Sequence, residues 1–416
     1  MHRRRFIQVA SATGGSLILK DLRSDVRASD RVGNWNFDQA AANRELAAHR
    51  IVKITGQQVR DRYPRSIGPN SRGRPVGGGG SYRVRTIATD KGAEGWAMCH
   101  LADEAVQPFI GMRVGDLFDV ETGSSDEAGA LDKALHDLAG NILGLPVWKL
   151  IGAAGPRQTL LYSGAIYMED VWPPDARRGI PAVLAACQQD YDAGYRAFKL
   201  KIGRGFKWMP RKEGLQRDIE VTRAVKKRFP DCRILVDAND AFTVDEAIKY
   251  VQSVADCDLY WIEEPFEEDY DGLKRLKDSM ANVGCRALLA DGERRKRQAK
   301  PLTRHGGYVE EFTDRLYRLA EAKLVDVFVL DLGIVGFTRW RRLMPKLIKA
   351  GIKASPHLWM WTPRTYYCAQ FAAGVGNVCI IEGIPGRAPE IDYSAYKITD
   401  GKLVVPDTPG FGLKLI

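Results

Sequence analysis

Three acidic side chains in the middle of the chain follow short apolar runs. Asp237 ends the run Ile234–Val236, Glu263 ends the run Tyr260–Ile262, and Glu293 comes shortly after a third run. Runs that are apolar throughout are typical of strands buried on both faces, and the carboxyl ends of such strands form the active-site mouth of an α/β barrel. Carboxylates that meet there supply oxygen ligands, which suit Mg²⁺, with Mn²⁺ also acceptable. We therefore expect Asp237, Glu263 and Glu293 to bind one divalent cation.

Two points about this set stay open. Asp291 lies two residues before Glu293 and would share its face of a strand, so it is an alternative third ligand, although we favour Glu293. The acids can instead cap the helices that follow, as Asp often does. Zinc suits the set less well, because neither cysteines nor clustered histidines accompany the three acids.

Two lysines precede the first acid by about one strand and one helix. Lys199 and Lys201 flank Leu200, so both ammonium groups would point to the same side of a strand. Like charges and desolvation lower the pKa of a lysine, which can make it a base near neutral pH. We expect Lys201 to act as a base, and Lys199 to stabilise developing negative charge.

A second acid/base pair is expected on the far side of the same mouth. His357 follows one apolar run and Asp331 follows the run before it. A carboxylate beside a histidine fixes its tautomer and stabilises the imidazolium. Glu382 ends the last run and, if protonated, would donate a hydrogen bond to an enolate. Together with a metal ion, this set suits removal of a proton next to a carboxylate.

The elements that must position these residues are repeated strand and helix units. From residue 158 to about residue 394, eight short apolar runs alternate with helical stretches, and each polar residue above ends one run. A barrel of parallel strands brings such ends together around one mouth. The sequence therefore predicts an α/β fold, a modified TIM barrel over residues 158–394.

The segment before the barrel has a different pattern. Three strand-like segments, His49–Arg60, Tyr82–Thr89 and Glu94–Ala97, precede a helix with 3–4 spacing at Leu131–Leu143. We expect an α+β capping domain over residues 30–157, against which the C-terminal tail, about 395–416, is a candidate to pack. Between the first two strands, Asp61–Ser81 is expected to be a long glycine-rich loop that acts as a lid or is disordered. The lid is favoured because the loop carries groups that can meet an anionic ligand: Tyr63, Arg65, Arg72 and Arg74.

Composition narrows the class of protein further. The chain has 416 residues, 45% hydrophobic and 27% charged, with a net charge of +10, and these fractions are typical of a globular enzyme. The basic residues are scattered rather than interleaved with aromatic ones, so we expect no nucleic-acid partner and a preference for acidic small molecules. The seven cysteines have no CxxC spacing and are expected to be buried apolar residues.

The first 28 residues are interpreted as an export leader. Arg3–Gln8 resembles a twin-arginine motif, and the apolar stretch Val9–Leu19 that follows is too short to span a membrane. A functional leader would place the protein in the periplasm, and the chain would otherwise be cytoplasmic. No later segment approaches 18 uninterrupted apolar residues, so we expect no membrane span.

As a set, these motifs resemble the enolase superfamily in its mandelate racemase-like subgroup. Lys199-Leu200-Lys201 resembles the KxK motif of that subgroup, the pair Asp331 and His357 its His-Asp dyad, and Glu382 its last-strand acid. The three Mg²⁺ ligands of the family correspond to Asp237, Glu263 and Glu293. The resemblance implies a capping domain on a modified (β/α)7β barrel, Mg²⁺, and often a homo-oligomer. One departure is a longer interval before Asp331, which carries the basic run Arg294–Arg297 as a surface insertion or an anion-binding loop.

Three functions remain open at this point. The first is dehydration of a sugar acid to a 2-keto-3-deoxy acid, in which Lys201 removes the α-proton and His357 protonates the departing hydroxyl. The second is racemisation or epimerisation of a 2-hydroxy acid by the same Lys and His. The third is a non-catalytic barrel that binds acidic ligands through its basic surface.

Overall fold

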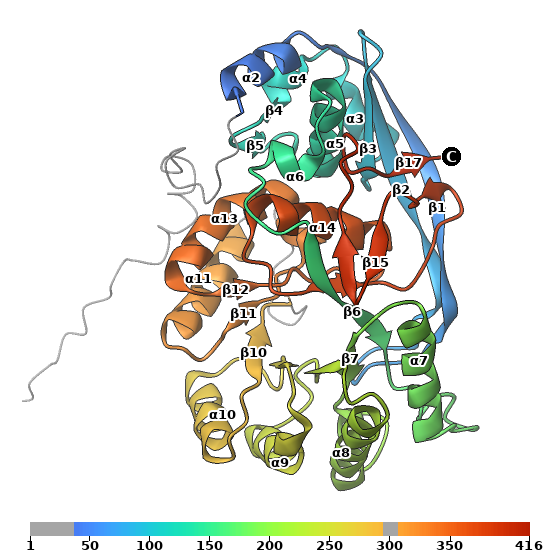
Figure 1. Ribbon diagram of the computed structural model, residues 1–416, viewed down its shortest axis with the longest axis vertical. Helices are drawn as coiled ribbons and strands as arrows, with labels where there is room; N and C mark the ends of the chain where they lie inside the picture. The colour runs from blue at the N-terminus through green and yellow to red at the C-terminus, as the bar shows by residue number, and fades with distance from the viewer. Residues whose placement is uncertain (1–36, 294–306) are drawn as a thin grey trace, which may run out of the picture.

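The computed structural model describes residues 37–293 and 307–416, which form a capping domain set on the end of a barrel (Figure 1). The expected leader, residues 1–28, and the basic run Arg294–Arg297 lie outside the described residues. Within the described residues, no helix is both long and apolar enough to cross a membrane.

The capping domain is a three-stranded antiparallel sheet with helices on one side. Its strands are β1 (Ile51–Ile67), β2 (Gly77–Thr89) and β3 (Glu94–Met98), in that order. Helix α5 packs so closely on β3 that a Cβ on Gly95 would lie 2.3 Å from the backbone of Leu138. The helices and short strands of the cap are α2 (Gln39–Ala47), α3 (Asp103–Val106), α4 (Val114–Leu117), β4 (Phe118–Asp119), β5 (Gly123–Ser124), α5 (Asp132–Leu143) and α6 (Val147–Leu150).

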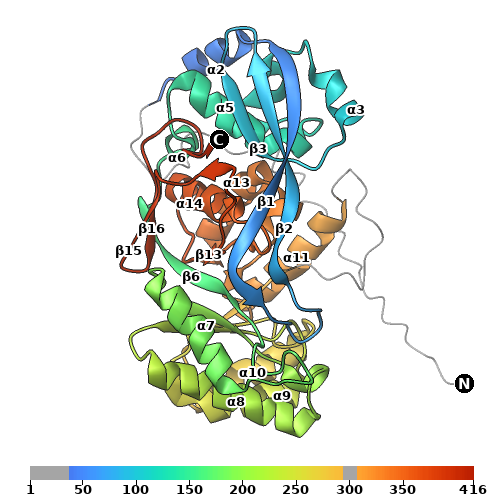
Figure 2. The same cartoon turned by 90° about the vertical axis from the view of Figure 1, so that its right-hand side faces the viewer.

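The expectation of a long loop over Asp61–Ser81 is wrong. Strands β1 and β2 form one long hairpin that runs down to the barrel, and only residues 68–76 connect them (Figure 2). The glycine run pairs with β1, where Asp61 lies opposite Gly80 and Arg62 opposite Gly79. Glycine is required there, since a Cβ on Gly79 would lie 2.0 Å from the carbonyl oxygen of Asp61. The run therefore lets the two strands approach closely and does not make a loose lid.

Three of the four side chains proposed to reach an anion from this hairpin, all except Arg74, are instead bound to other parts of the protein. Arg65 forms an ion pair with Asp190 at 2.6 Å. Arg72 donates from Nε to the carbonyl oxygen of Asn239, and the hydroxyl of Tyr63 donates to the carbonyl oxygen of Met360. Because these partners belong to the barrel, the hairpin is docked on it.

The barrel closes from eight parallel strands. Hydrogen bonding joins each strand to the next, and β13 pairs with β6 while an isolated bridge joins Ala354 to Val378, which completes the circle. The strands are β6 (Gln158–Ile166), β7 (Ala197–Lys201), β8 (Arg233–Asp237), β9 (Trp261–Glu263), β10 (Leu288–Asp291), β11 (Val327–Phe328), β12 (Lys353–Ala354) and β13 (Ile381–Gly383).

Helices on the outside connect successive strands, as a (β/α)7β barrel requires. The connecting helices are α7 (Ile180–Asp192), α8 (Arg211–Arg228), α9 (Val244–Val254), α10 (Tyr270–Asn282), α11 (Gly307–Glu321), α12 (Leu332–Val335), α13 (Phe337–Ala350) and α14 (Pro363–Val375). The predicted α/β fold with a modified TIM barrel is confirmed.

The interior of the barrel sets the direction of the functional side chains. A separate buried cluster fills it, with Ala197 from β7, Leu235 from β8 and Trp261 from β9 among its members. Alternate residues of a strand point to the same face. Four functional side chains therefore also point inward, at the carboxyl ends of their strands: Lys199 and Lys201 on β7, Asp237 on β8 and Glu263 on β9.

The C-terminal tail first extends the barrel sheet and then reaches the cap. Strands β15 (Lys397–Thr399) and β16 (Lys402–Val404) form a hairpin that pairs with β6. Beyond it, the backbone N–H of Phe411 donates to Asp137 of α5 at 2.7 Å, and β17 (Lys414–Leu415) pairs with β14 (Ile391–Asp392). Figure 1 shows the C-terminus beside the cap.

Candidate active site

The three acids expected to bind a metal ion lie together at the mouth of the barrel. Asp237 ends β8, Glu263 ends β9, and Glu293 follows β10 by two residues. One carboxylate oxygen from each lies within 4.8 Å of the other two. The parallel register produces this arrangement, because Lys201 pairs with Asp237 and Asp237 with Glu263 at the same level of the sheet.

The structure brings Glu293, rather than Asp291, into this trio. Ala290 belongs to the interior cluster and pairs with Glu263, so the next residue, Asp291, points away from the interior. Burial and the nearby Glu268 raise the pKa of Asp291 well above its ordinary value. Gly292 then adopts a φ of +121°, which interrupts the alternation before Glu293. The idea that both acids share one strand face is wrong, because the strand has ended at Asp291.

The trio suits a hard divalent cation. Asp237 and Glu263 are fully buried side by side, and burial, followed by the charge of Asp237, raises the pKa of Glu263 to about 8. A buried oxygen of Glu293, Oε2, accepts no hydrogen bond from the described part of the chain. Adjacent buried carboxylates with unsatisfied oxygens need a positive charge, and three oxygen donors without sulfur match the preference of Mg²⁺.

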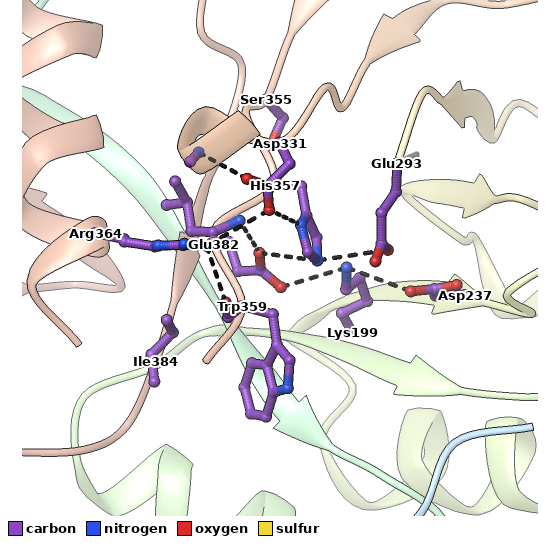
Figure 3. A network of polar contacts seen from close by, with 12 residues as sticks. Lys199, Asp237, Glu293, Asp331, Ser355, His357, Trp359, Arg364, Glu382 and Ile384 are labelled. Atoms are coloured by element: carbon purple, nitrogen blue, oxygen red, sulfur yellow. Dashed lines mark hydrogen bonds and ion pairs between the residues drawn. The ribbon is translucent and has the colours of Figure 1, made fainter. Parts of the chain in front are cut away.

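Lys199 supplies positive charge deep in the site. Its Nζ lies 3.1 Å from Glu263, 3.4 Å from Asp237 and 3.4 Å from Glu382. Burial would lower the pKa of this lysine, but the surrounding carboxylates outweigh burial and hold the pKa well above its ordinary value. Lys199 is therefore a fixed cation that compensates the acids (Figure 3).

Lys201 contacts the metal trio and a neighbouring amide. Its Nζ donates to Oδ2 of Asp237 and, at 3.1 Å, to Oδ1 of Asn239. The expected lowering of a lysine pKa is wrong here, because Asp237 outweighs both burial and Lys199 and raises the pKa of Lys201. The same contacts, working against burial, lower the pKa of Asp237 to about 2. The sequence shows two neighbouring lysines but not how close the carboxylate lies.

A buried ionic network fixes the end of the strand that carries Lys201. The guanidinium of Arg204 donates to the carbonyl oxygen of Lys201 at 3.1 Å and to Asp218 at 2.7 Å. It also forms a bidentate contact with Asp170 at 2.7 and 2.9 Å. All three charged side chains are buried, so they hold the turn after β7 in one position.

His357 and Asp331 form the expected pair. Nδ1 of His357 lies 2.8 Å from Oδ2 of Asp331, and Nε2 lies 3.4 Å from Oε2 of Glu293. Burial would lower the pKa of His357, but Glu293, Glu382 and Asp331 raise it to about 9. Because Nδ1 is directed at Asp331, Nε2 is the nitrogen that faces the acid cluster (Figure 3).

Glu382 connects Lys199 to the segment after His357. Its Oε2 accepts a hydrogen bond of 2.6 Å from the backbone N–H of Leu358, and Oε1 faces Lys199. Burial would raise the pKa of Glu382, but Lys199 and His357 lower it. Glu382 is thus held as a carboxylate rather than in the protonated form that would donate a hydrogen bond to an enolate.

Sequence reasoning missed aromatic residues near these groups. The ring of Tyr167 lies 5.4 Å from Nζ of Lys201 and 5.0 Å from the ring of Trp359. Trp359 follows His357 by two residues, which is the one signal in the sequence for it.

Comparison with known proteins places the chain in a family. The family described as Enolase C-terminal domain-like matches residues 182–307 and 309–416. D-galactarolactone cycloisomerase of Agrobacterium fabrum is 26% identical over 300 residues, which are 68% of this chain and 70% of that protein.

Solved structures agree over almost the whole chain. The galacturonate dehydratase of a Geobacillus species, in complex with D-galacturonate and 5-keto-4-deoxy-D-galacturonate, is 29% identical with a TM-score of 0.79, covering 89% of this chain and 95% of that one. A mandelate racemase/muconate lactonizing protein of Geobacillus sp. Y412MC10, in complex with magnesium and tartrate, is 28% identical with a TM-score of 0.78, covering 89% and 94%. The chain therefore belongs to the enolase superfamily, in its mandelate racemase-like group, and is an enzyme of that superfamily.

Proposed function

We propose that this enzyme uses Mg²⁺ to dehydrate a sugar acid to a 2-keto-3-deoxy acid. The observation that carries the proposal is the placement of two proton-transfer groups beside one acid trio. Lys201 contacts Asp237 of the trio from β7, and Nε2 of His357 faces Glu293 from the segment after β12. A substrate carboxylate bound at the trio would have its α-carbon within reach of groups from two different strands.

Each residue of the site has its own role in the proposed reaction. Lys201, as the free amine, takes the proton from the carbon next to the carboxylate, and Lys199 stabilises the negative charge that develops on the carboxylate oxygens. Asp237, Glu263 and Glu293 would hold a Mg²⁺ ion, which would supply further stabilisation of the same charge and would offset the charge of Asp237 that raises the pKa of Lys201. His357, held by Asp331, gives a proton from Nε2 to the departing β-hydroxyl, which leaves as water. Ketonisation of the enol then gives the 2-keto-3-deoxy acid.

The substrate class is supported by the relatives. The two molecules in the Geobacillus dehydratase complex, D-galacturonate and its 5-keto-4-deoxy product, differ by one water. In that product the keto carbon adjoins the carboxylate, which is the outcome of α-proton removal followed by β-elimination. D-Galacturonate is therefore the first substrate to test, followed by aldonic and aldaric acids.

A racemase or epimerase is the second candidate, because Lys201 and His357 reach the trio from separate strands. If they contact opposite faces of the α-carbon, a proton returned on the other face inverts the configuration without loss of water.

We also propose that the protein is a homo-oligomer, on the family resemblance, and that it is exported, on the residues Arg3–Gln8. Light scattering and cell fractionation test these two proposals.

An acid-sugar panel tests the function directly. The purified enzyme is incubated with each acid and Mg²⁺, before and after chelation, and 2-keto acid is measured as the semicarbazone. We expect Mg²⁺-dependent keto acid from at least one acid, lost in Lys201→Ala and in His357→Ala. Lys207→Ala is a matched control, because that lysine contacts the carbonyl oxygen of Gly73, at 3.4 Å, and the ring of Trp208, and neither belongs to the acid trio. Inversion of configuration without keto acid would favour the racemase, and activity retained in both site variants would contradict both candidates.

A further inference from the structure

Trp359 lies among the groups of the candidate active site but has no role in the proposed mechanism. The backbone N–H of the preceding residue, Leu358, is bound to Glu382 at 2.6 Å. The indole ring packs on Tyr167 at 5.0 Å between ring centroids, and the ring of Tyr167 is 5.4 Å from Nζ of Lys201. Figure 3 draws this tryptophan with Glu382 and Lys199. Trp359 is therefore one contact away from the base, through Tyr167, and directly follows the residue that binds the last-strand acid.

The polar atom of this side chain is not used inside the protein. The side chain is half-buried, and its indole N–H makes no hydrogen bond with the described part of the chain. Tryptophan N–H groups usually find a partner when buried. An aromatic face with a free donor beside a carboxylate site suits the carbon chain of a hydroxy acid, since the face packs on C–H groups and the N–H binds an oxygen.

The capping hairpin holds this part of the backbone in place. Met360 has a φ of +98°, a region that a residue with a side chain rarely adopts. The hydroxyl of Tyr63 donates to the carbonyl oxygen of Met360, and Asp61 accepts a 2.7 Å hydrogen bond from the backbone N–H of Thr362. One of these contacts from β1 is made to the strained residue itself and the other two residues after it, so they stabilise a conformation that the segment would not keep alone.

We propose that Trp359 is a substrate-binding residue for 2-hydroxy carboxylates, with its indole N–H donating to a substrate oxygen, and that Tyr63 and Asp61 are positioning residues for it. This inference rests on the proposed function, because it takes the ligand class from that reaction. Trp361 has a different role, since its ring packs on Tyr82 at 5.0 Å within the docked hairpin.

Binding of tartrate, a small hydroxy diacid, tests the role of Trp359 without turnover. Isothermal titration calorimetry with Mg²⁺ present compares wild type, Trp359→Phe and Trp361→Phe. Trp359→Phe keeps an aromatic ring and loses the donor, so we expect about five- to tenfold weaker binding, the range for one neutral hydrogen bond. Trp361→Phe, the matched control, is expected to bind within about twofold of wild type. Equal affinities in the two variants, or no Mg²⁺-dependent tartrate binding by wild type, would overturn the proposal.

A second variant separates positioning from folding. Tyr63→Phe removes only the hydroxyl that holds Met360, and Tyr63 touches none of the acids of the trio in the described contacts. We expect weaker tartrate binding and a higher KM for any acid sugar that turns over, with kcat and the unfolding midpoint close to wild type. A lower midpoint with unchanged affinity would show a structural role and contradict the inference. Failure of the proposed function is recognised separately, as a wild-type enzyme that binds tartrate but forms no keto acid.

Discussion

Asp331 accepts from Nδ1 of His357 at 2.8 Å and, through its other oxygen, begins helix α12. That oxygen, Oδ1, accepts the backbone N–H groups of Gly333 at 2.6 Å and Ile334 at 2.9 Å. One carboxylate therefore has its position fixed by the helix and in turn fixes the imidazole. The rotation of the histidine is set by the fold rather than by the substrate.

Asp331→Asn is expected to lower kcat by about two to four orders of magnitude while the fold is kept. An asparagine oxygen can still accept from Gly333 and Ile334, but its NH2 group would face Nδ1 and reverse the tautomer of His357. That tautomer is neutral, so its N–H on Nε2 is a far weaker acid than the imidazolium that Asp331 stabilises. Steady-state kinetics measure the loss of kcat, and the urea unfolding midpoint shows whether the fold is kept. A variant with nearly normal kcat would show that Asp331 is not needed to keep His357 as the proton donor.

Glu293→Gln is expected to weaken Mg²⁺ binding by at least about tenfold, since even the loss of an outer-shell partner costs that much. Asp291→Asn is the matched control from the same turn and is expected to keep Mg²⁺ affinity within about threefold. Titration calorimetry with Mg²⁺ alone measures both. If Asp291→Asn had the larger effect, the ligand assignment from the trio would be wrong.

Gly80→Ala is expected to destabilise the protein by about 1–3 kcal/mol, the usual cost of overpacking. A Cβ at Gly80 would lie 2.9 Å from the ring of Trp361, whereas a Cβ at Gly78 has no atom within 4 Å. Gly78→Ala is therefore the control, expected to be neutral or slightly stabilising. Urea unfolding compares the two, and equal midpoints would contradict the docking of the hairpin on Trp361.

The cap–barrel interface contains a histidine that should make stability depend on pH. Nδ1 of His136 is 2.8 Å from the carbonyl oxygen of Asp132, and Arg341, which can only donate, lies 3.0 Å from Nε2. Nε2 thus carries a lone pair and the ring is neutral. Burial lowers the pKa of His136 from its ordinary 6.5, in spite of the nearby Asp132.

The direction in which pH changes the free energy of unfolding follows from the difference in the pKa of His136 between the folded and unfolded states. A histidine whose pKa is lowered in the folded state contributes stability that is present above pH 6.5 and is lost as the pH falls below it. The difference in free energy of unfolding between wild type and His136→Gln is therefore expected to shrink between pH 7.5 and pH 5.5. Urea titrations at several pH values measure this difference, and a difference independent of pH would contradict a neutral His136.

The barrel and most of its site could be predicted because parallel strands place their carboxyl ends at one mouth. Asp237 and Glu263 follow directly from strand ends, and the pairing of Asp331 with His357 follows from adjacent strands. Glu293 was harder to choose, because the turn at Gly292 decides which acid points inward. That turn is a backbone conformation, and an apolar pattern does not encode it.

What the sequence could not predict depends on contacts between distant segments. A run of four glycines predicts a loop, although its pairing with β1 and its contact with Trp361 are what require glycine here. The pKa of Lys201 was expected to fall because the closeness of Asp237 was unknown. Trp359 was missed since its ring partners, Tyr63 and Tyr167, lie far from it in sequence.

The measurement closest to the central claim follows the hydrogen on the carbon next to the substrate carboxylate. D-Galacturonate, or any acid sugar that turns over in the panel, is incubated with Mg²⁺ in D2O, and proton NMR records the loss of that hydrogen. The account predicts loss with wild type, reduced by about 10²-fold or more in Lys201→Ala. Equal rates of loss in wild type and Lys201→Ala, or no loss from any acid sugar with Mg²⁺ bound, would contradict it.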